Sequence, residues 1–217
     1  MTFKNPICSA ETDGAVYGGS LPEYVLRESA RGTDQVAVET RAYEDGSIYI
    51  RGPINDELSQ KFMQLLRIAA SDKKNLWIYI NSPGGSVQAG LAMLDGIRAY
   101  PHDLSICCIG LAASMGAVLL AGGRTGQRYI LPHSKVMVHE PLIAGGLGGS
   151  ATSIQRTAES IMETKNTLNG LLAEFTGRTV EEIDKNPAYD NFFNAEEAIE
   201  FGLCDKLATG YEGIVNG

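Results

Sequence analysis

The sequence has 217 residues, of which 44% are hydrophobic and 20% charged, a balance typical of one globular domain with a sizeable core. Its formal net charge of −8 argues against nucleic acid or an anionic membrane as the main partner. No apolar segment is long enough to span a bilayer, and residues 1–19 lack the apolar stretch of a secretory signal.

The cysteines indicate a reducing compartment. Cys8, Cys107, Cys108 and Cys204 form no CxxC pair and no ligand spacing with histidine, so no metal site is expected. Cys107 and Cys108 lie in an apolar run, which is typical of inert core thiols. We therefore expect a cytoplasmic protein.

The N-terminal part of the chain is weakly patterned. Residues 1–35 combine scattered charges with several glycines and show little periodicity. This composition predicts an N-terminal arm with a short helix near residues 22–29. Residues 36–217 are then expected to form a single catalytic domain.

Strands and helices alternate from residue 47 onward. Apolar runs bounded by turn residues predict strands, and apolar residues at helical spacing predict helices. The expected elements are a strand at 47–50, a helix after the N-cap Asn55, a strand at 76–80, a helix from Val87, a strand at 104–109, a helix after Ser114, and short strands at 129–131 and 135–139. This order predicts an α/β fold with a mainly parallel sheet.

The last third of the chain is mostly helical. A glycine-rich stretch at residues 143–149 precedes a long apolar-striped helix over residues 151–175. Capping-box patterns at Thr179 and Asn194 begin two further helices. Residues 203–207 are expected to form a closing strand, and no linker divides the chain.

Ser114 stands where a predicted strand turns into a helix. Ala112, Ser114 and Gly116 form a small-x-Ser-x-small pattern, which is similar to a nucleophile elbow with alanine where the first glycine is usual. Serine is also a favoured helix N-cap, and a strand-to-helix junction needs no chemistry to explain it. Taken alone, the segment favours the cap.

A nucleophilic serine needs a base, and the sequence offers only His102, His133 and His139. The α/β-hydrolase order requires an acid between serine and histidine, and none lies between Ser114 and His139. His102 precedes Ser114 but is too near in sequence to approach it from another element. The order Ser, His, Asp remains, with His139 at a strand end, where parallel sheets build sites.

A glycine turn at residues 81–85, Asn-Ser-Pro-Gly-Gly, is the second candidate element. Its backbone N–H groups can bind an oxyanion or an extended peptide beside a helix N-terminus. Pro-Gly-Gly is also an ordinary turn, which is the simpler interpretation of this motif alone.

Four motifs together resemble the proteolytic subunit of the Clp protease. They are the turn at 81–85, the serine segment at 110–116, the Leu-Pro and His-Glu-Pro sequences within 131–141, and Tyr-Asp-Asn-Phe at 189–192. The similarity runs from about residue 48 to residue 207. It implies the ClpP/crotonase-like fold, an α/β ββα superhelix with a handle at about residues 141–176, formed by a strand, the glycine-rich loop and the long helix.

The resemblance also implies a role for each candidate site residue. Ser114 is the nucleophile, His139 is the general base and then the acid, and Asp190 orients the histidine. The backbone N–H groups of Gly85 and Met115 form the oxyanion hole.

The same resemblance implies how a peptide binds. Its main chain is expected to add as a strand, a β-augmentation mode. The residues that flank this strand are Gly84, Gly85, Ser86 and Val87 on one side and Leu142 on the other.

The resemblance further implies an assembly. Two stacked heptameric rings interlock through their handles and enclose a chamber, and an AAA+ unfoldase of the ClpX, ClpA or ClpC type threads unfolded polypeptides in. The sequence holds no P-loop pattern, so a separate chain is expected to use the ATP. We expect a homo-oligomeric tetradecamer in protein quality control, without metal or cofactor, in which residues 1–35 are the axial region.

Two residues and one loop depart from the family pattern. Glu140 stands where glutamine is usual, Tyr189 stands where arginine is common, and the glycine-rich loop is longer than usual. In many members both positions take part in ring–ring contacts. These departures leave open a mixed ring with a second paralogue, in which this chain is poorly active or regulatory.

Two further classes share the superfamily. A crotonase-type acyl-CoA enzyme sets backbone N–H groups against a thioester oxyanion and usually uses a glutamate. A signal-peptide peptidase of this superfamily pairs serine with lysine and normally carries a membrane segment. Reaction of a fluorophosphonate or β-lactone at Ser114 separates a serine peptidase from the crotonase type and from a non-catalytic subunit.

Overall fold

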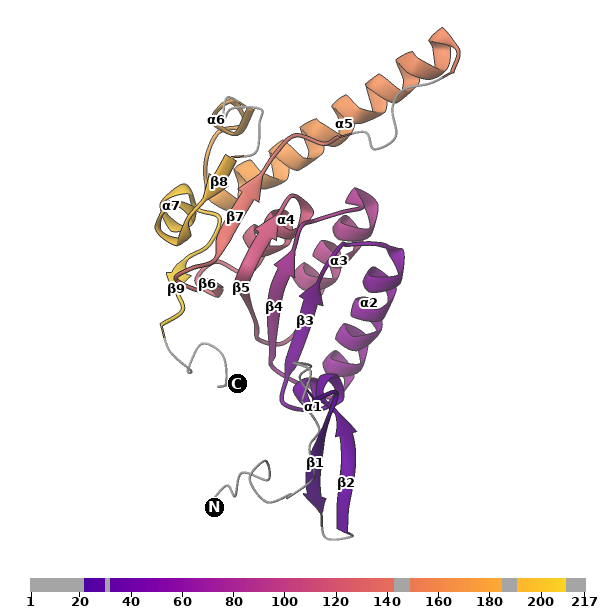
Figure 1. The fold of residues 1–217 in the computed structure, drawn as a ribbon. Coiled ribbons are helices and arrows are strands. Elements are labelled where there is room, and N and C mark those ends of the chain that lie inside the picture. Colours follow the sequence, from indigo (N-terminus) through magenta and orange to yellow (C-terminus); the bar gives the residue numbers. More distant parts are fainter. Residues whose placement is uncertain (1–21, 30–31, 143–148, 185–190, 210–217) are drawn as a thin grey trace, which may run out of the picture. The chain divides into compact units, whose positions relative to one another are not determined.

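The computed structural model describes residues 22–29, 32–142, 149–184 and 191–209 (Figure 1). The chain divides into two compact units, Met1–Arg41 and Ala42–Gly217.

The first unit holds a β-hairpin. Strand β1 (Tyr24–Ser29) pairs antiparallel with β2 (Gly32–Ala37), from Tyr24 opposite Ala37 to Ser29 opposite Gly32. Strand β2 runs directly into helix α1 (Val38–Glu44). The helix expected near residues 22–29 is therefore wrong. The backbone groups of this segment bond to a second strand rather than within a helix, and a local reading of the sequence does not show that partner.

The second unit is built on a seven-stranded sheet, which confirms the predicted α/β fold. Five strands lie in parallel in the order β3 (Ser47–Arg51), β4 (Leu76–Ser82), β5 (Leu104–Ala113), β6 (Arg128–Ile130) and β9 (Lys206–Leu207). Strand β7 (Lys135–Val138) lies parallel to β5, and β8 (Asn191–Phe193) pairs antiparallel with β7.

Strand β5 changes partners along its length. Its first half pairs with β6 and its second half, residues 111–113, pairs with β7. Gly110 lies between the two halves with a φ of +110°, and its N–H donates to Ser134 Oγ at 2.6 Å. The sequence predicts that this strand ends near residue 109, but pairing with β7 extends it to Ala113. This extension brings the residue after Ala113 beside the end of β7.

The two faces of the sheet differ. Ile48, Ile50, Ile78 and Ile80 are buried in the main core beneath the helices. The opposite face carries a ladder of stacked aromatic rings, with Tyr49 against Tyr79 at 4.9 Å, followed by Trp77 and Tyr129. Alternate residues of these strands therefore contribute to two separate clusters, the main core and a smaller one that includes Tyr79 and Cys107.

Helices α2 (Asp56–Ser71), α3 (Val87–Ala99) and α4 (Met115–Ala121) contribute to that core, and every residue of α4 is buried. The helix caps predicted at Asn55, Thr179 and Asn194 are all present. Asn55 accepts from the Leu58 N–H at 2.9 Å and begins α2. Thr179 begins α6 (Val180–Asp184) and Asn194 begins α7 (Ala195–Phe201), each exchanging capping bonds with a glutamate three residues on.

Helix α5 (Ala151–Thr176) is the long helix that the apolar stripe predicts. Its only fully buried residues are Leu168 and Leu172, in its second half. The first half extends away from the sheet (Figure 1). Ile154 and Met162 are exposed there, although they are large and apolar. The glycine-rich residues 143–148 lie outside the described residues.

A buried ion pair fastens the C-terminal ends of α4 and α5. Arg128, at 4% exposure, meets Asp205 at 2.6 Å and also donates to the carbonyls of Ala121 and Phe175 at 2.9 and 3.0 Å. Asp205 in turn accepts the N–H groups of Gly126 and Arg128 at 2.7 and 3.0 Å. Both charges are thus enclosed by hydrogen bonds, which a buried pair requires.

Candidate active site

Ser114 has an unusual backbone. Its φ of 54° and ψ of −121° lie in a region that residues with a Cβ rarely adopt, at a cost of about 1–3 kcal/mol. Its N–H donates to Met137 O at 2.8 Å, which joins the ends of β5 and β7. The surrounding structure therefore holds Ser114 in a strained turn between β5 and α4.

The Ser114 side chain does not cap α4. Ser114 occupies the N-cap position, but its hydroxyl makes no capping hydrogen bond. The segment on its own predicts that Ser114 caps the helix. Ser114 does stand at the N-cap position, but the capping hydrogen bond is absent. With this φ and ψ, the Oγ is left for other partners.

The glycine turn after β4 packs directly against Ser114. A Cβ on Gly84 would lie 2.5 Å from Ser114 Cβ and 2.7 Å from Ala113 O, and the Gly84 φ is +88°. Only glycine fits this close approach of two turns. Buried Ser82 fixes the turn, because its Oγ accepts from the Gly84 N–H at 3.1 Å and donates to Gly52 O at 2.7 Å.

Gly85 faces the site with its backbone. Ile54 forms a parallel bridge with Gly85, in which the Ile54 N–H donates to Gly84 O and the Ser86 N–H donates to Ile54 O, both at 2.8 Å. In an extended segment, the N–H and C=O of the residue between these two point to the opposite side. A Cβ on Gly85 would also collide with the Ile54 carbonyl. The Gly85 N–H is thus directed away from Ile54.

Met115 is the first residue of α4, so its N–H has no partner within the helix. Its side chain is buried at 1% exposure and lies against the α3 residue Gly90, where any Cβ would meet it. The Met115 nitrogen is 3.0 Å from the position a Gly84 Cβ would take. The predicted oxyanion donors thus come from adjoining turns.

His139 follows β7 directly. Ala113 lies opposite Met137 in the β5–β7 pairing, so Ser114 and His139 leave the same edge of the sheet. On the other side of β7, the described register ends with Val138 opposite Asn191. Asp190 precedes Asn191 in the sequence and lies outside the described residues, as does Tyr189.

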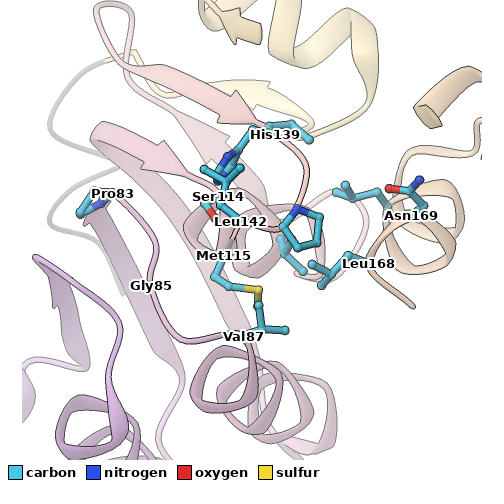
Figure 2. Close-up of a pocket in the computed structure, with 13 residues that line it drawn as sticks. Pro83, Gly85, Val87, Ser114, Met115, His139, Leu142, Leu168 and Asn169 are labelled. Carbon is cyan, nitrogen blue, oxygen red and sulfur yellow. The ribbon is translucent and has the colours of Figure 1, made fainter. Parts of the chain in front are cut away.

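Ser114 and His139 line one pocket of about 230 Å³ (Figure 2). Its lining comes from both turns, the end of β7, the segment that follows it, and helices α3, α4 and α5: Pro83, Gly85, Val87, Ser114, Met115, Val118, Val138, His139, Pro141, Leu142, Leu168, Asn169 and Leu172.

Most of the predicted site residues therefore meet at one place. Gly84 and Ser86 are not among the residues that line this pocket. Their backbone groups serve Ile54, and Ser86 caps α3 by accepting the Ala89 N–H at 3.3 Å.

Helix α5 supplies lining that the motifs do not indicate. Leu168 and Leu172 are one turn apart and buried, and Asn169 follows Leu168 in the lining (Figure 2). Their spacing matches the apolar stripe of the helix, but the sequence pattern cannot say which part of that stripe faces Ser114. Together with Val118 they make the wall of the pocket mainly apolar.

An ion-pair network adjoins the pocket. Lys165 on α5 lies 2.8 Å from Glu140 and 2.7 Å from Asp184, and Asp184 accepts from Asn169 at 3.2 Å. The hydrogen bonds to Asp184 and Glu140 raise the pKa of Lys165 above its ordinary range. The bond from Lys165 lowers the pKa of Asp184.

The buried cysteines lie apart from this pocket. Cys107, Cys108 and Cys204 are free thiols, and burial raises the pKa of each to about 12, which leaves them unreactive. Within the described ranges, no three His, Cys, Asp or Glu side chains cluster as metal ligands would. Nor does any helix in those ranges combine the length and apolarity that crossing a membrane requires.

The parallel sheet, the strained serine turn and the α5 handle define an α/β protein of the ClpP/crotonase-like fold. A family model described as Clp protease matches residues 30–210. The chain belongs to the Clp protease family, which makes it a ClpP-type peptidase.

Proposed function

We propose that this chain is the proteolytic subunit of an ATP-dependent Clp protease, a serine endopeptidase with Ser114 as nucleophile. The observation that carries the proposal is the Ser114 turn. Its hydroxyl makes no capping bond, its backbone is strained, and it shares a pocket with His139. Strain that surrounding contacts maintain at a pocket is typical of functional positions.

The proposed reaction uses His139 first as a base. His139 takes the proton from Ser114 Oγ as this oxygen attacks the scissile carbonyl, and then gives it to the leaving amine. Water then attacks the carbonyl of the acyl-enzyme. His139 takes a proton from this water and returns it to Ser114 Oγ as the acid product leaves. Asp190, next in sequence to the strand residue opposite Val138, is the proposed carboxylate that orients His139.

The backbone N–H groups of Gly85 and Met115 are the proposed oxyanion donors. One points away from its bridge with Ile54, and the other begins α4 without a helical partner. Donors fixed in this way need no reorganisation when negative charge develops on the substrate oxygen. The Gly85 backbone and Leu142 are the proposed flanks for peptide main chain, while Gly84 and Ser86 shape the turn.

The apolar wall favours an apolar substrate side chain beside the cleaved bond. Val118, Leu168 and Leu172 are buried around the pocket, and no Asp, Glu or Lys is among its described lining residues. This lining offers no glutamate for crotonase chemistry and no lysine for a serine–lysine pair.

The assembly is part of the proposal. The first half of α5 carries Ile154 and Met162 exposed at 40% and 53%, which suits a handle that packs between two stacked heptameric rings. We propose that an AAA+ unfoldase supplies unfolded polypeptide and uses the ATP. The free buried thiols support a cytoplasmic location.

The test is native mass spectrometry after reaction with a fluorophosphonate, together with hydrolysis of short apolar peptides. We expect one label per subunit on Ser114, carried by a tetradecamer, and no label on Ser114→Ala. Ser86→Ala is the matched control, because it removes the other N-cap serine near the pocket, and it should label normally. Well-assembled rings that neither label nor cleave peptides would overturn the peptidase assignment and favour a regulatory subunit of a mixed ring.

A further inference from the structure

The segment that follows His139 is anchored by a side chain rather than by a strand. Residues 139–142 belong to no helix or strand, and yet His139, Pro141 and Leu142 line the pocket. The intervening residue, Glu140, turns to α5 instead, where its Oε1 accepts from Lys165 Nζ at 2.8 Å.

Lys165 links this segment to two other elements. Its Nζ also lies 2.7 Å from Asp184 Oδ1 on α6, and the same oxygen accepts from Asn169 Nδ2 at 3.2 Å. Asn169 is one turn after Lys165 on α5 and lines the pocket. One ammonium thus joins the residue next to His139, helix α6 and the pocket wall.

The Lys165 side chain is more shielded than its two carboxylate partners. It is 19% exposed, whereas Glu140 and Asp184 are 42% and 50% exposed. Lys165 also holds two carboxylates at once. Without its charge, Glu140 loses the cation that holds it to α5, and Glu140 and Asp184 repel each other.

We propose that Lys165 is a positioning residue for the active site: through Glu140 it holds residues 139–142 in place, and with them the His139 ring and the Pro141 and Leu142 wall of the pocket. This inference rests on the proposed function of His139. It also explains the glutamate at position 140, because a glutamine there can accept a hydrogen bond from Lys165 but cannot form the ion pair.

The experiment compares Lys165→Met, Lys165→Arg, Glu140→Gln and the double variant Glu140→Gln/Lys165→Met with the wild type. Glu174→Gln is the matched control, since it breaks an ion pair of the same helix away from the pocket. The readouts are the fluorophosphonate labelling rate of Ser114, kcat and KM for a short peptide, and hydrogen exchange of a peptide covering residues 136–142. Native mass spectrometry ensures that equal assemblies are compared.

We expect Lys165→Met to lower both the labelling rate and kcat/KM by about tenfold to a hundredfold, since small displacements of a catalytic group have effects of this size. Exchange of residues 136–142 should accelerate about tenfold, since their anchor is gone. Lys165→Arg should restore most of the activity. The double variant should lose no more than Lys165→Met alone, since both changes remove the same ion pair.

Unchanged labelling and exchange in Lys165→Met would overturn the inference. So would an equal loss in Glu174→Gln, or additive losses in the double variant. Glu140→Gln keeps the question answerable if Lys165→Met does not fold. A wild type that fails to label would instead refute the proposed function, and the exchange rates alone would then decide whether Lys165 holds residues 139–142.

Discussion

Two serines stand at equivalent places in this fold and behave differently. Ser86 follows β4 and Ser114 follows β5, and each is the N-cap residue of the next helix. Ser86 has a φ of −58° and accepts the Ala89 N–H at 3.3 Å. Ser114 has a φ of 54° and makes no capping bond.

The difference comes from the neighbours of each serine. Ser114 is held by the Met137 carbonyl from β7 and by Gly84, which packs against its Cβ. Among the described residues, Ser86 hydrogen-bonds to Ile54 and to its own helix. The missing capping bond therefore distinguishes Ser114, the proposed nucleophile, from Ser86.

The largest expected effect that separates the two is loss of catalysis in Ser114→Ala. Peptide hydrolysis should fall by about 10⁴-fold or more, because the change removes the proposed nucleophile. The free energy of unfolding should change by less than about 0.5 kcal/mol, since no capping bond is lost. Peptidase assays and urea unfolding at one protein concentration measure both, and turnover within tenfold of the wild type would contradict the role of Ser114.

The opposite end of α4 provides the next test, because the buried Arg128–Asp205 ion pair fastens it. Asp205→Ala leaves Arg128 buried without its partner, which should cost about 3–5 kcal/mol in unfolding free energy. Urea unfolding checks this, with Glu57→Ala as control, since the Glu57–Lys61 pair lies exposed within α2. A loss no greater than that of Glu57→Ala would show that the buried pair does not fasten α4.

The same pair predicts a pH dependence. Burial raises the pKa of Asp205, but hydrogen bonds and charge from Arg128 outweigh burial and leave this pKa below its ordinary value. A carboxyl with a lowered folded-state pKa stabilises the fold above its unfolded pKa, and this stabilisation is lost as the pH falls through the folded pKa. Below about pH 4, wild type should lose stability more steeply than Asp205→Asn, as acid titration at fixed urea would measure. Parallel curves would contradict this coupling.

Gly84→Ala should make the close approach of the two turns impossible. The new Cβ would meet Ser114 Cβ at 2.5 Å, in a backbone with a φ of +88°, so a loss of about 2–3 kcal/mol is expected. Labelling of Ser114 should also slow, because the turn must move away from it. Gly126→Ala is a suitable control, since its φ is +86° but nothing lies within 4 Å of its Cβ position. Equal effects of the two changes would mean that backbone strain alone explains Gly84.

Ser86→Ala should produce the smallest effect. Loss of its capping bond should cost about 1 kcal/mol, while labelling of Ser114 stays close to wild type. Denaturant unfolding and the labelling rate measure the two quantities separately. A stability loss in Ser114→Ala that matches the loss in Ser86→Ala would remove the distinction between the two serines.

Local sequence patterns are sufficient to predict many of the helices and strands of this protein. The alternation of apolar runs and helical stripes predicted the parallel sheet and helix α5, and the caps at Asn55, Thr179 and Asn194 form as expected. These features follow from residues within a few positions of each other, so the sequence suffices for them. The order of serine and histidine along the chain also indicated the pair that the pocket brings together.

Other features of the fold and of the candidate site depend on the tertiary structure, because contacts between segments far apart in the sequence determine them. Pairing with β2 turns residues 24–29 into a strand, and pairing with β7 extends β5 to Ala113. Contacts with Gly84 and Met137 hold Ser114 in a conformation that serine would not choose by itself, and the fold brings Lys165 from α5 to Glu140. Backbone hydrogen bonds and packing between such segments offset the local preferences of the residues, and this is why Ser114, a favourable cap by sequence, keeps its hydroxyl free of the helix.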